Sequence, residues 1–386
     1  MYDFDTPVNR KNTDCSKWDN MSSMFTQKDL LPLWIADMDF KVCDEITQAI
    51  VRRAEHGVFG YTVLGQEYYD ALAGWMRRRH GWKIERDWVT TSVTVVSALN
   101  IMVQCYTAPG DGIIIQKPVY FPFEECVLTN GRKLANNALV NNDGYYTMDF
   151  ADLEQKAADP QNKMMILCSP HNPVCRAWKR EELARVADIC ERNNVILVSD
   201  EVHGDFVYGD NRFLPMGTIT GYQKVVTCTA PSKTFNLAGL KLANIIIPDE
   251  ELRKRFNQRS KSECGIVPNN PLSIEGVKAA YAHGDRWVDE AKAYIYENYL
   301  FLKRQIEKEL PMLKVTPLEA TFLAWVDFAG TGLRGESLSD FLRNRAKVGL
   351  DEGFVFGKEG ETYARINLAT NRLVVKECLE RIQNSL

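Results

Sequence analysis

Short, uninterrupted apolar runs constrain the fold of this chain more than any other feature. Five runs of about five residues lack polar alternation, which is typical of strands buried on both faces; they are residues 112–116, 163–168, 194–199, 224–228 and 244–248. Residues 179–193 separate the second run from the third and carry apolar side chains at helical spacing. This order of strand, helix and strand predicts an α/β domain with a mainly parallel sheet.

A break and a long helix indicate where that domain ends. Residues 265–271 are rich in turn formers, and residues 285–310 carry an apolar stripe that stops before Pro311. We therefore expect an N-terminal segment over 1–30, a large domain over 31–284 and a smaller α+β domain over 285–386. Strands at 322–326 and 364–368 are expected in the smaller domain.

Composition excludes several classes of protein. The 386 residues carry a net charge of −4, with 45% hydrophobic and 25% charged residues, which is ordinary for a soluble globular protein and unlike a nucleic-acid binder. The ten cysteines form no CxxC pair, so no metal site is expected. No signal-like or membrane-length apolar run occurs, and scattered thiols suit a reducing compartment; we expect a cytoplasmic location and no membrane partner.

Polar residues directly follow three of the apolar runs. Asn172, Asp200 and Lys233 come after the second, third and fourth runs. Ligands of doubly wound sheets bind beyond the carboxyl ends of the strands, so these side chains could converge on one crevice. A desolvated lysine there is a usable amine nucleophile, and a buried carboxylate needs a cationic partner such as a pyridinium nitrogen.

Each of these residues has a plainer alternative when it is taken alone. A lysine after a strand is usually on the surface, an aspartate there is often a helix cap, and Asn-Pro is usually a turn. The functional interpretation depends on their joint order and spacing.

The joint pattern resembles a known superfamily. Residues 172–173 (NP), 199–203 (SDEVH), 232–236 (SKTFN) and 365–367 (RIN) are similar to fold-type I pyridoxal 5′-phosphate (PLP) enzymes of aminotransferase class I/II. Further segments resemble the MalY/PatB family of cystathionine β-lyases and C–S lyases; they are residues 34–40 (WIADMDF), 60–62 (GYT), 117–120 (KPVY), 169–173 (SPHNP), 200–205 (DEVHGD) and 230–240 (APSKTFNLAGL). The resemblance implies the three-layer αβα PLP-transferase fold.

The resemblance also implies a role for each site residue. Lys233 would form a Schiff base with PLP and act as acid and base, Asp200 would pair with the ring nitrogen, and Tyr120 would stack on the ring. Asn172 and His203 would lie near the ring oxygen. The phosphate would be held by Val95, Val96, Ser232, Lys241 and, from a second subunit, Tyr61. Substrate would be bound by Arg365, Ala36 and Asn172.

Several of those residues keep a structural alternative. Tyr61 and Tyr120 could be packing residues, His203 a structural histidine and Arg365 an edge-strand charge. The amides near Val95 have independent support, because residues 98–105 are helix-like and a helix N-terminus favours phosphate.

The chain departs from the family pattern at a few positions. Cys175 stands where many relatives have Gly, at a cost if its φ is positive. Thr94 replaces a common Gly before the phosphate amides, Ala230 replaces a common Ser, and residues 367–372 (NLATNR) differ from the usual Ala-Cys-Pro-Arg. No catalytic group is lost.

The resemblance predicts α,β-elimination of cystathionine or related cysteine S-conjugates to pyruvate, ammonia and a thiol. A class I/II aminotransferase is the nearest alternative, because it shares Lys233, Asp200 and Arg365. A non-catalytic regulatory protein with the same fold is a further alternative. A homodimer with shared active sites is expected if Tyr61 serves the partner's phosphate.

Overall fold

The computed structural model describes residues 2–23, 25–27 and 29–386, so residues 1, 24 and 28 of the predicted N-terminal segment lie outside the described residues. A seven-stranded sheet forms its centre, in the order β2-β10-β9-β8-β7-β3-β4. Only β10 runs antiparallel to its neighbours in this sheet. The strands are β2 (Val89–Ser92), β3 (Gly112–Ile115), β4 (Lys133–Asn136), β7 (Asn162–Cys168), β8 (Ile196–Asp200), β9 (Val225–Thr229) and β10 (Ala243–Ile246). The predicted mainly parallel α/β sheet is confirmed.

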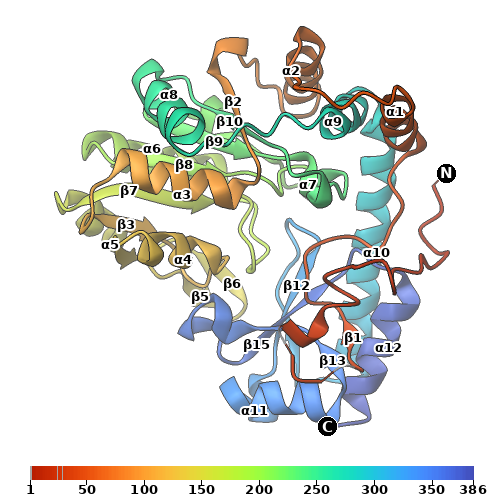
Figure 1. The fold of residues 1–386 in the computed structure, drawn as a ribbon. Helices are drawn as coiled ribbons and strands as arrows, with labels where there is room; N and C mark the ends of the chain where they lie inside the picture. The colour runs from red at the N-terminus through yellow and green to blue at the C-terminus, as the bar shows by residue number, and fades with distance from the viewer. Residues whose placement is uncertain (1, 24, 28) are drawn as a thin grey trace.

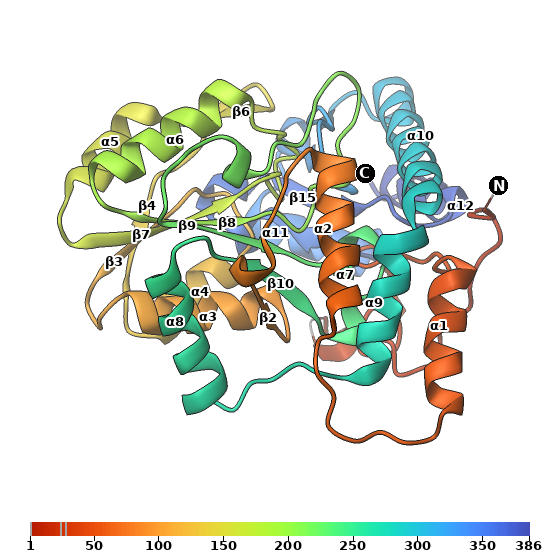
Figure 2. The same ribbon diagram turned by 90° about the horizontal axis from the view of Figure 1, so that it is seen from above.

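Helices cover both faces of this sheet. Helices α3 (Val95–Tyr106), α4 (Pro122–Thr129) and α8 (Glu250–Asn257) lie on one face, and α5 (Phe150–Ala158) and α6 (Arg180–Arg192) on the other (Figure 2). Alternate residues of each central strand join different apolar clusters: Met164 and Ile166 pack toward α3, whereas Met165 and Leu167 pack toward α6. Burial on both faces is why these strands read as continuous apolar runs.

The remaining helices flank the sheet or belong to the C-terminal part. Helices α1 (Asp44–Glu55), α2 (Gln66–His80) and α9 (Pro271–His283) pack together, and α7 (Pro231–Thr234) is a single turn after β9. Helix α10 (Asp285–Glu309) runs from the end of α9 down to the smaller sheet (Figure 1). It matches the predicted long helix within one residue, because its apolar stripe is buried along most of its length. The last helices are α11 (Gly335–Asp340) and α12 (Arg372–Gln383).

The smaller sheet is antiparallel and has the order β11-β12-β15-β14. Its strands are β11 (Lys314–Val315), β12 (Leu323–Asp327), β14 (Asp351–Glu352) and β15 (Tyr363–Asn367). Two short pairs complete the strands: β5 (Val140–Asn142) with β6 (Tyr145–Thr147), and β1 (Leu31–Pro32) with β13 (Val348–Gly349). The β1–β13 pair joins the residues directly after the predicted N-terminal segment to the C-terminal part of the chain. The domain boundaries at 30/31 and 284/285 stay predictions.

No helix among the described residues is long and apolar enough to cross a membrane.

The buried stripe of α10 predicts where stability resides. Leu302→Ala should lower the free energy of unfolding by about 2–5 kcal/mol, because the side chain is fully buried and its removal leaves a cavity. Arg304→Ala, on the exposed side of the same helix, should change it by less than about 0.5 kcal/mol. Urea denaturation of both variants measures the difference, and equal midpoints would contradict the packing assigned to α10.

Candidate active site

Three neighbouring parallel strands bring the predicted polar residues to one edge of the large sheet. Cys168 at the end of β7 pairs with Asp200 at the end of β8, which pairs in turn with Cys228 of β9. Asn172 lies four residues beyond β7, and Lys233 lies on the helical turn that follows β9. Strand register therefore places Asn172, Asp200 and Lys233 at the same edge.

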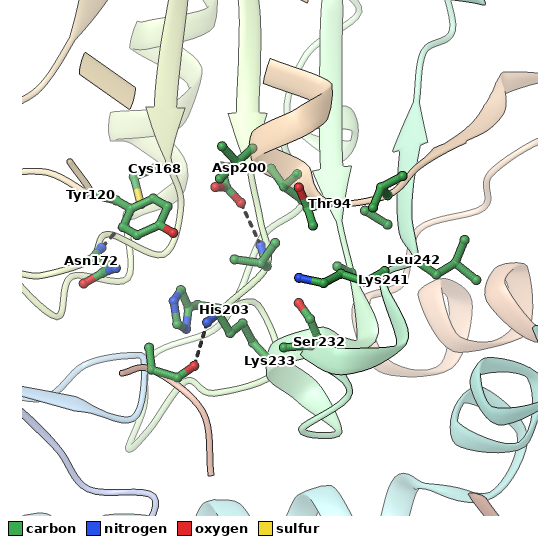
Figure 3. Close-up of a pocket in the computed structure, with 18 residues that line it drawn as sticks. Thr94, Tyr120, Cys168, Asn172, Asp200, His203, Ser232, Lys233, Lys241 and Leu242 are labelled. Carbon is green, nitrogen blue, oxygen red and sulfur yellow. Dashed lines mark hydrogen bonds between the residues drawn. The ribbon is translucent and has the colours of Figure 1, made fainter. Parts of the chain in front are cut away.

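These residues share a cavity of about 340 Å³. Figure 3 shows Ser232 and Lys241 on one side, Tyr120 and Asn172 on the other, and Asp200 between them. Of the twelve predicted site residues, ten line this cavity: Ala36, Val95, Val96, Tyr120, Asn172, Asp200, His203, Ser232, Lys233 and Lys241. The single crevice expected from the strand ends is thus present.

Lys233 is held at the cavity wall as a reactive amine. Its Nζ donates a hydrogen bond to the Ala36 carbonyl oxygen at 2.6 Å (Figure 3). Burial and, after it, the nearby positive charge of Arg365 lower the pKa of Lys233 to about 8, against the opposing pull of Asp37 and Asp200. Because the neutral amine is the nucleophile, this shift makes Lys233 usable near neutral pH.

Asp200 is a buried carboxylate with no strong counter-ion. One of its oxygens accepts a hydrogen bond from the Val202 amide at 3.3 Å. Burial raises the pKa of Asp200 to about 7, although the Val202 amide and the charge of Lys233 oppose the rise. Among the described residues Asp200 forms no ion pair within 4.0 Å. A cationic ligand atom beside it would relieve the desolvation cost.

His203 and Tyr120 bound the same space with neutral groups. Burial lowers the pKa of His203 well below its usual value, and Lys233 and Arg365 lower it further, so the imidazole is uncharged at neutral pH. Its Nδ1 is buried and has no hydrogen-bond partner among the described residues. Burial raises the pKa of Tyr120 to about 12, so its phenol keeps its proton.

The N-terminus of α3 lines one side of the cavity. Val95 and Val96 are its first two residues, and amides of the first turn have no partner within the helix. Thr94 caps the helix by accepting a hydrogen bond from the Ser97 amide at 3.0 Å. The φ of Thr94 is −146°, so replacement of the common Gly causes no backbone strain here. The side chains of Ser232 and Lys241 face the same space (Figure 3).

Arg365 on β15 joins the small sheet to the site. Its Nη1 donates to Asn172 Oδ1 at 3.0 Å, and its Nη2 donates to the Trp34 carbonyl oxygen at 3.0 Å. It also forms a buried ion pair with Asp351, which lies opposite it on β14. Arg365 does not line the cavity itself, but its contact with Asn172 places it beside the cavity. The guanidinium Nε has no partner among the described residues.

Tyr61 lies apart from the cavity within one chain. Its side chain is fully exposed and lines a separate hollow with Phe59 and Val267. Placement of Tyr61 in a site therefore requires a second chain.

Cys175 has a positive φ, as the Gly of many relatives at this position would permit. Its φ is 63°, so a residue with a Cβ does occupy the left-handed conformation that favours Gly. The side chain is buried, and its Sγ donates to the Leu323 carbonyl oxygen at 3.0 Å. This contact ties the turn to β12.

Two residues beside the cavity had no assigned role from the sequence. Cys168 lines the cavity and closes β7, but a cysteine in an apolar run carries no signal of a ligand site. Asp351 meets Arg365 only through the antiparallel pairing of β14 with β15, which a two-residue strand does not reveal.

The donors and acceptors of the cavity fit a flat ring with a basic nitrogen, a ring oxygen and a phosphate. Asp200 lacks a cation, His203 Nδ1 lacks a partner, and helix α3 offers free amides at the other end. Between these groups Lys233 presents an amine suited to a carbonyl carbon.

Comparisons with known proteins agree with this geometry. The sequence model for "Aminotransferase class I and II" matches residues 28–382. Cystathionine beta-lyase PatB of Bacillus subtilis is 40% identical over 385 residues, covering 99% of each chain. Cystalysin from Treponema denticola, whose crystal structure contains PLP, superposes with a TM-score of 0.96 at 36% identity, covering 100% of this chain and 98% of that one. A PLP-bound protein from Clostridium difficile 630, provisionally named an aminotransferase, superposes with a TM-score of 0.97 at 38% identity over the full length of both.

The raised pKa of Asp200 predicts a pH-dependent change in stability without cofactor. The folded state retains a proton up to about pH 7, whereas the unfolded carboxyl releases it near 3.8, so stability falls as the pH rises between these values. In cofactor-free protein, Asp200→Asn should therefore raise the free energy of unfolding at about pH 8 by roughly 1–4 kcal/mol, and less at about pH 5.

Urea titrations at the two pH values measure this effect. Asp210→Asn is the matched control, because Asp210 is exposed in a loop. A variant at position 200 that is less stable than the parent at about pH 8 would show that the carboxylate is not under net desolvation stress.

Proposed function

We infer that this chain, which belongs to the aminotransferase class I and II family, is a PLP-dependent carbon–sulfur β-lyase that converts L-cystathionine or a related cysteine S-conjugate to pyruvate, ammonia and a thiol. One observation carries the inference: Lys233 and Asp200 face one cavity from beyond the ends of adjacent strands, and the N-terminus of α3 lines the same cavity. The 40% identity to a cystathionine β-lyase over almost the full length supports the lyase assignment.

The residues of the cavity divide the work of holding the cofactor. Asp200 would keep the ring nitrogen protonated, Asn172 and His203 would face the ring oxygen, and Tyr120 would pack on the ring. The amides of Val95 and Val96, with the side chains of Ser232 and Lys241, line the cavity and would hold the phosphate. PLP, when bound, supplies an aldehyde for imine formation and a ring that accepts an electron pair.

The same chain positions the substrate and moves its protons. Arg365 would hold the α-carboxylate as a two-pronged donor, with Ala36 and Asn172 beside it. The neutral amine of Lys233, favoured by its lowered pKa, would take the proton from Cα. It would then return a proton to the departing sulfur, and water would complete the products pyruvate and ammonia.

A second subunit is part of this proposal. Tyr61 is fully exposed among other exposed apolar residues, namely Val58, Phe59, Val63 and Val267, which suits an interface better than a solvated loop. In a homodimer Tyr61 would reach the phosphate site of the partner chain. We also assign the enzyme to the cytoplasm, because all ten cysteines are free thiols and most are buried.

The lyase assignment predicts a product pattern. Incubation with L-cystathionine, without any keto-acid acceptor, should give one pyruvate and one thiol per substrate consumed, since elimination needs no acceptor. Lys233→Ala should lose at least about 10³-fold in rate, because it removes the proton carrier, and should lose the visible absorption band of the bound cofactor.

Lys376→Ala, an exposed lysine of α12, is the matched control and should behave as the parent. Turnover only in the presence of a keto acid would instead identify an aminotransferase. A retained absorption band in Lys233→Ala would refute the assignment of this lysine, and an absence of any turnover or band in the parent would favour a non-catalytic protein.

The shared site predicts complementation between variants. Tyr61→Ala should weaken cofactor binding, because each phosphate loses a donor, while Lys233→Ala is inactive. Refolding the two variants together should restore a site that combines Lys233 of one subunit with Tyr61 of the other, and hence tighter cofactor binding than Tyr61→Ala alone. Fluorescence titration of the cofactor measures the recovery. No recovery, or a fully active monomer in sedimentation, would disprove the shared site.

A further inference from the structure

A second hollow, called here the cationic hollow, is lined by residues that include four arginine and lysine side chains. Its volume is about 530 Å³. It is formed by the end of α2, the loop after β8 and the side of α10, which contribute Arg78, Arg79, His80, Asp205, Arg212 and Lys292. Four permanent cations and one histidine thus surround the hollow, against one lining carboxylate.

Capping of a helix dipole explains only part of this charge. Arg78 and Arg79 lie in the last turn of α2, where cations are favoured, and they pair with Asp285 at 2.9 Å and Asp289 at 2.6 Å. Arg212 comes from a loop and Lys292 from the interior of α10, so neither serves a helix end.

Arg212 and Lys292 are the cations available to a ligand. Neither forms an ion pair in the part of the chain that the structure describes. Lys292 is half-buried, and burial together with the neighbouring Arg79 lowers its pKa. An amine that is partly desolvated beside another cation is costly unless an anion joins it.

Consecutive residues of the loop after β8 line the catalytic cavity and the cationic hollow. His203 lines the catalytic cavity, whereas Gly204 and Asp205 line the cationic hollow. Gly204 packs against the Phe213 ring so closely that an added Cβ would lie 2.7 Å from it. The Phe213 ring in turn meets the His80 ring edge-on at 4.9 Å between centroids.

Asp205 connects the hollow to the catalytic lysine. Its Oδ1 lies 3.1 Å from His80 Nε2, and its Oδ2 accepts a hydrogen bond from Thr234 Oγ1 at 2.6 Å. Thr234 is the residue after Lys233 on the same helical turn. The carboxylate is therefore shared between a residue of the cationic hollow and the backbone segment that carries the reactive amine.

We propose that this hollow is an effector site for a small multivalent oxyanion of the phosphate-ester or diphosphate class, and that its occupancy is transmitted to Lys233 through Asp205 and Thr234. Guanidinium groups suit phosphate oxygens because they offer planar paired donors, and Lys292 adds a compact charge. A bound anion competes with Asp205 for His80, which changes how firmly Asp205 holds Thr234. Binding at this site does not depend on the proposed lyase activity.

Calorimetry of the holoenzyme with inorganic pyrophosphate, at saturating PLP, tests the binding. Saturable binding at one site per chain is expected, and Arg212→Gln and Lys292→Gln should each weaken it by about tenfold or more, since each removes a charge-assisted contact. Both variants should keep the parent's activity without pyrophosphate. Arg304→Gln, an exposed arginine elsewhere on α10, is the matched control and should bind as the parent does. Absence of saturable binding, or equal binding in all variants, would overturn the site.

Steady-state kinetics with and without saturating pyrophosphate test the transmission. A change of about twofold or more in kcat or KM is expected in the parent and in Arg304→Gln, and none in Arg212→Gln at the same concentration. Thr234→Val should bind pyrophosphate as tightly as the parent, yet lose the kinetic response relative to its own rate. Binding without a kinetic response in the parent, or a response that survives in Thr234→Val, would overturn the coupling.

Discussion

The site depends on the desolvation of Asp200 and Lys233, two groups of opposite charge that lie at the same edge of the large sheet. Burial raises the pKa of Asp200 to about 7 and lowers that of Lys233 to about 8, so each group is moved toward its neutral form by the same loss of water. Their mutual attraction opposes both shifts but does not cancel them. A site arranged in this way is poorly satisfied by the protein alone and well satisfied by a ligand with a basic nitrogen and a carbonyl group.

The large sheet brings Asp200 and Lys233 to the same cavity, Asp200 at the end of β8 and Lys233 on the short turn after β9. Because β7, β8 and β9 are parallel and in register, the loops after them emerge side by side, and each needs only a few residues to reach the cavity. The cap of Thr94 and the buried thiol of Cys175 show how two substituted turn positions remain compatible with the same frame. Thr94 avoids strain through an extended φ, whereas Cys175 accepts a left-handed φ and gains a contact with β12.

Sequence reasoning was sufficient where local pattern decides the structure. Strands β7, β8 and β9 are buried on both faces, so apolar runs in the sequence predicted them. The apolar stripe of α10 predicted both ends of that helix to within one residue. Asn172, Asp200 and Lys233 were predicted because they follow those strands, and the other seven residues of the cavity were predicted from the family resemblance. The sequence did not predict the ion pair of Arg365 with Asp351, because it depends on the pairing of a two-residue strand. It did not predict the cationic hollow either, because that hollow forms only where α2, α10 and a loop meet. Tyr61 shows the remaining limit, since its place in any site requires a second chain.

The pairing of Arg365 with Asp351 has a consequence for how amino acids enter. The guanidinium already holds a resident carboxylate, so a substrate acid that binds Arg365, as we propose, would have to share or displace it. Burial raises the pKa of Asp351 to about 6, despite the opposing charge of Arg365, which makes the resident acid easier to neutralise than an ordinary aspartate. Under this proposal Asp351 competes with the α-carboxylate of the substrate for Arg365. An amine without an acid group could not displace Asp351 from the guanidinium.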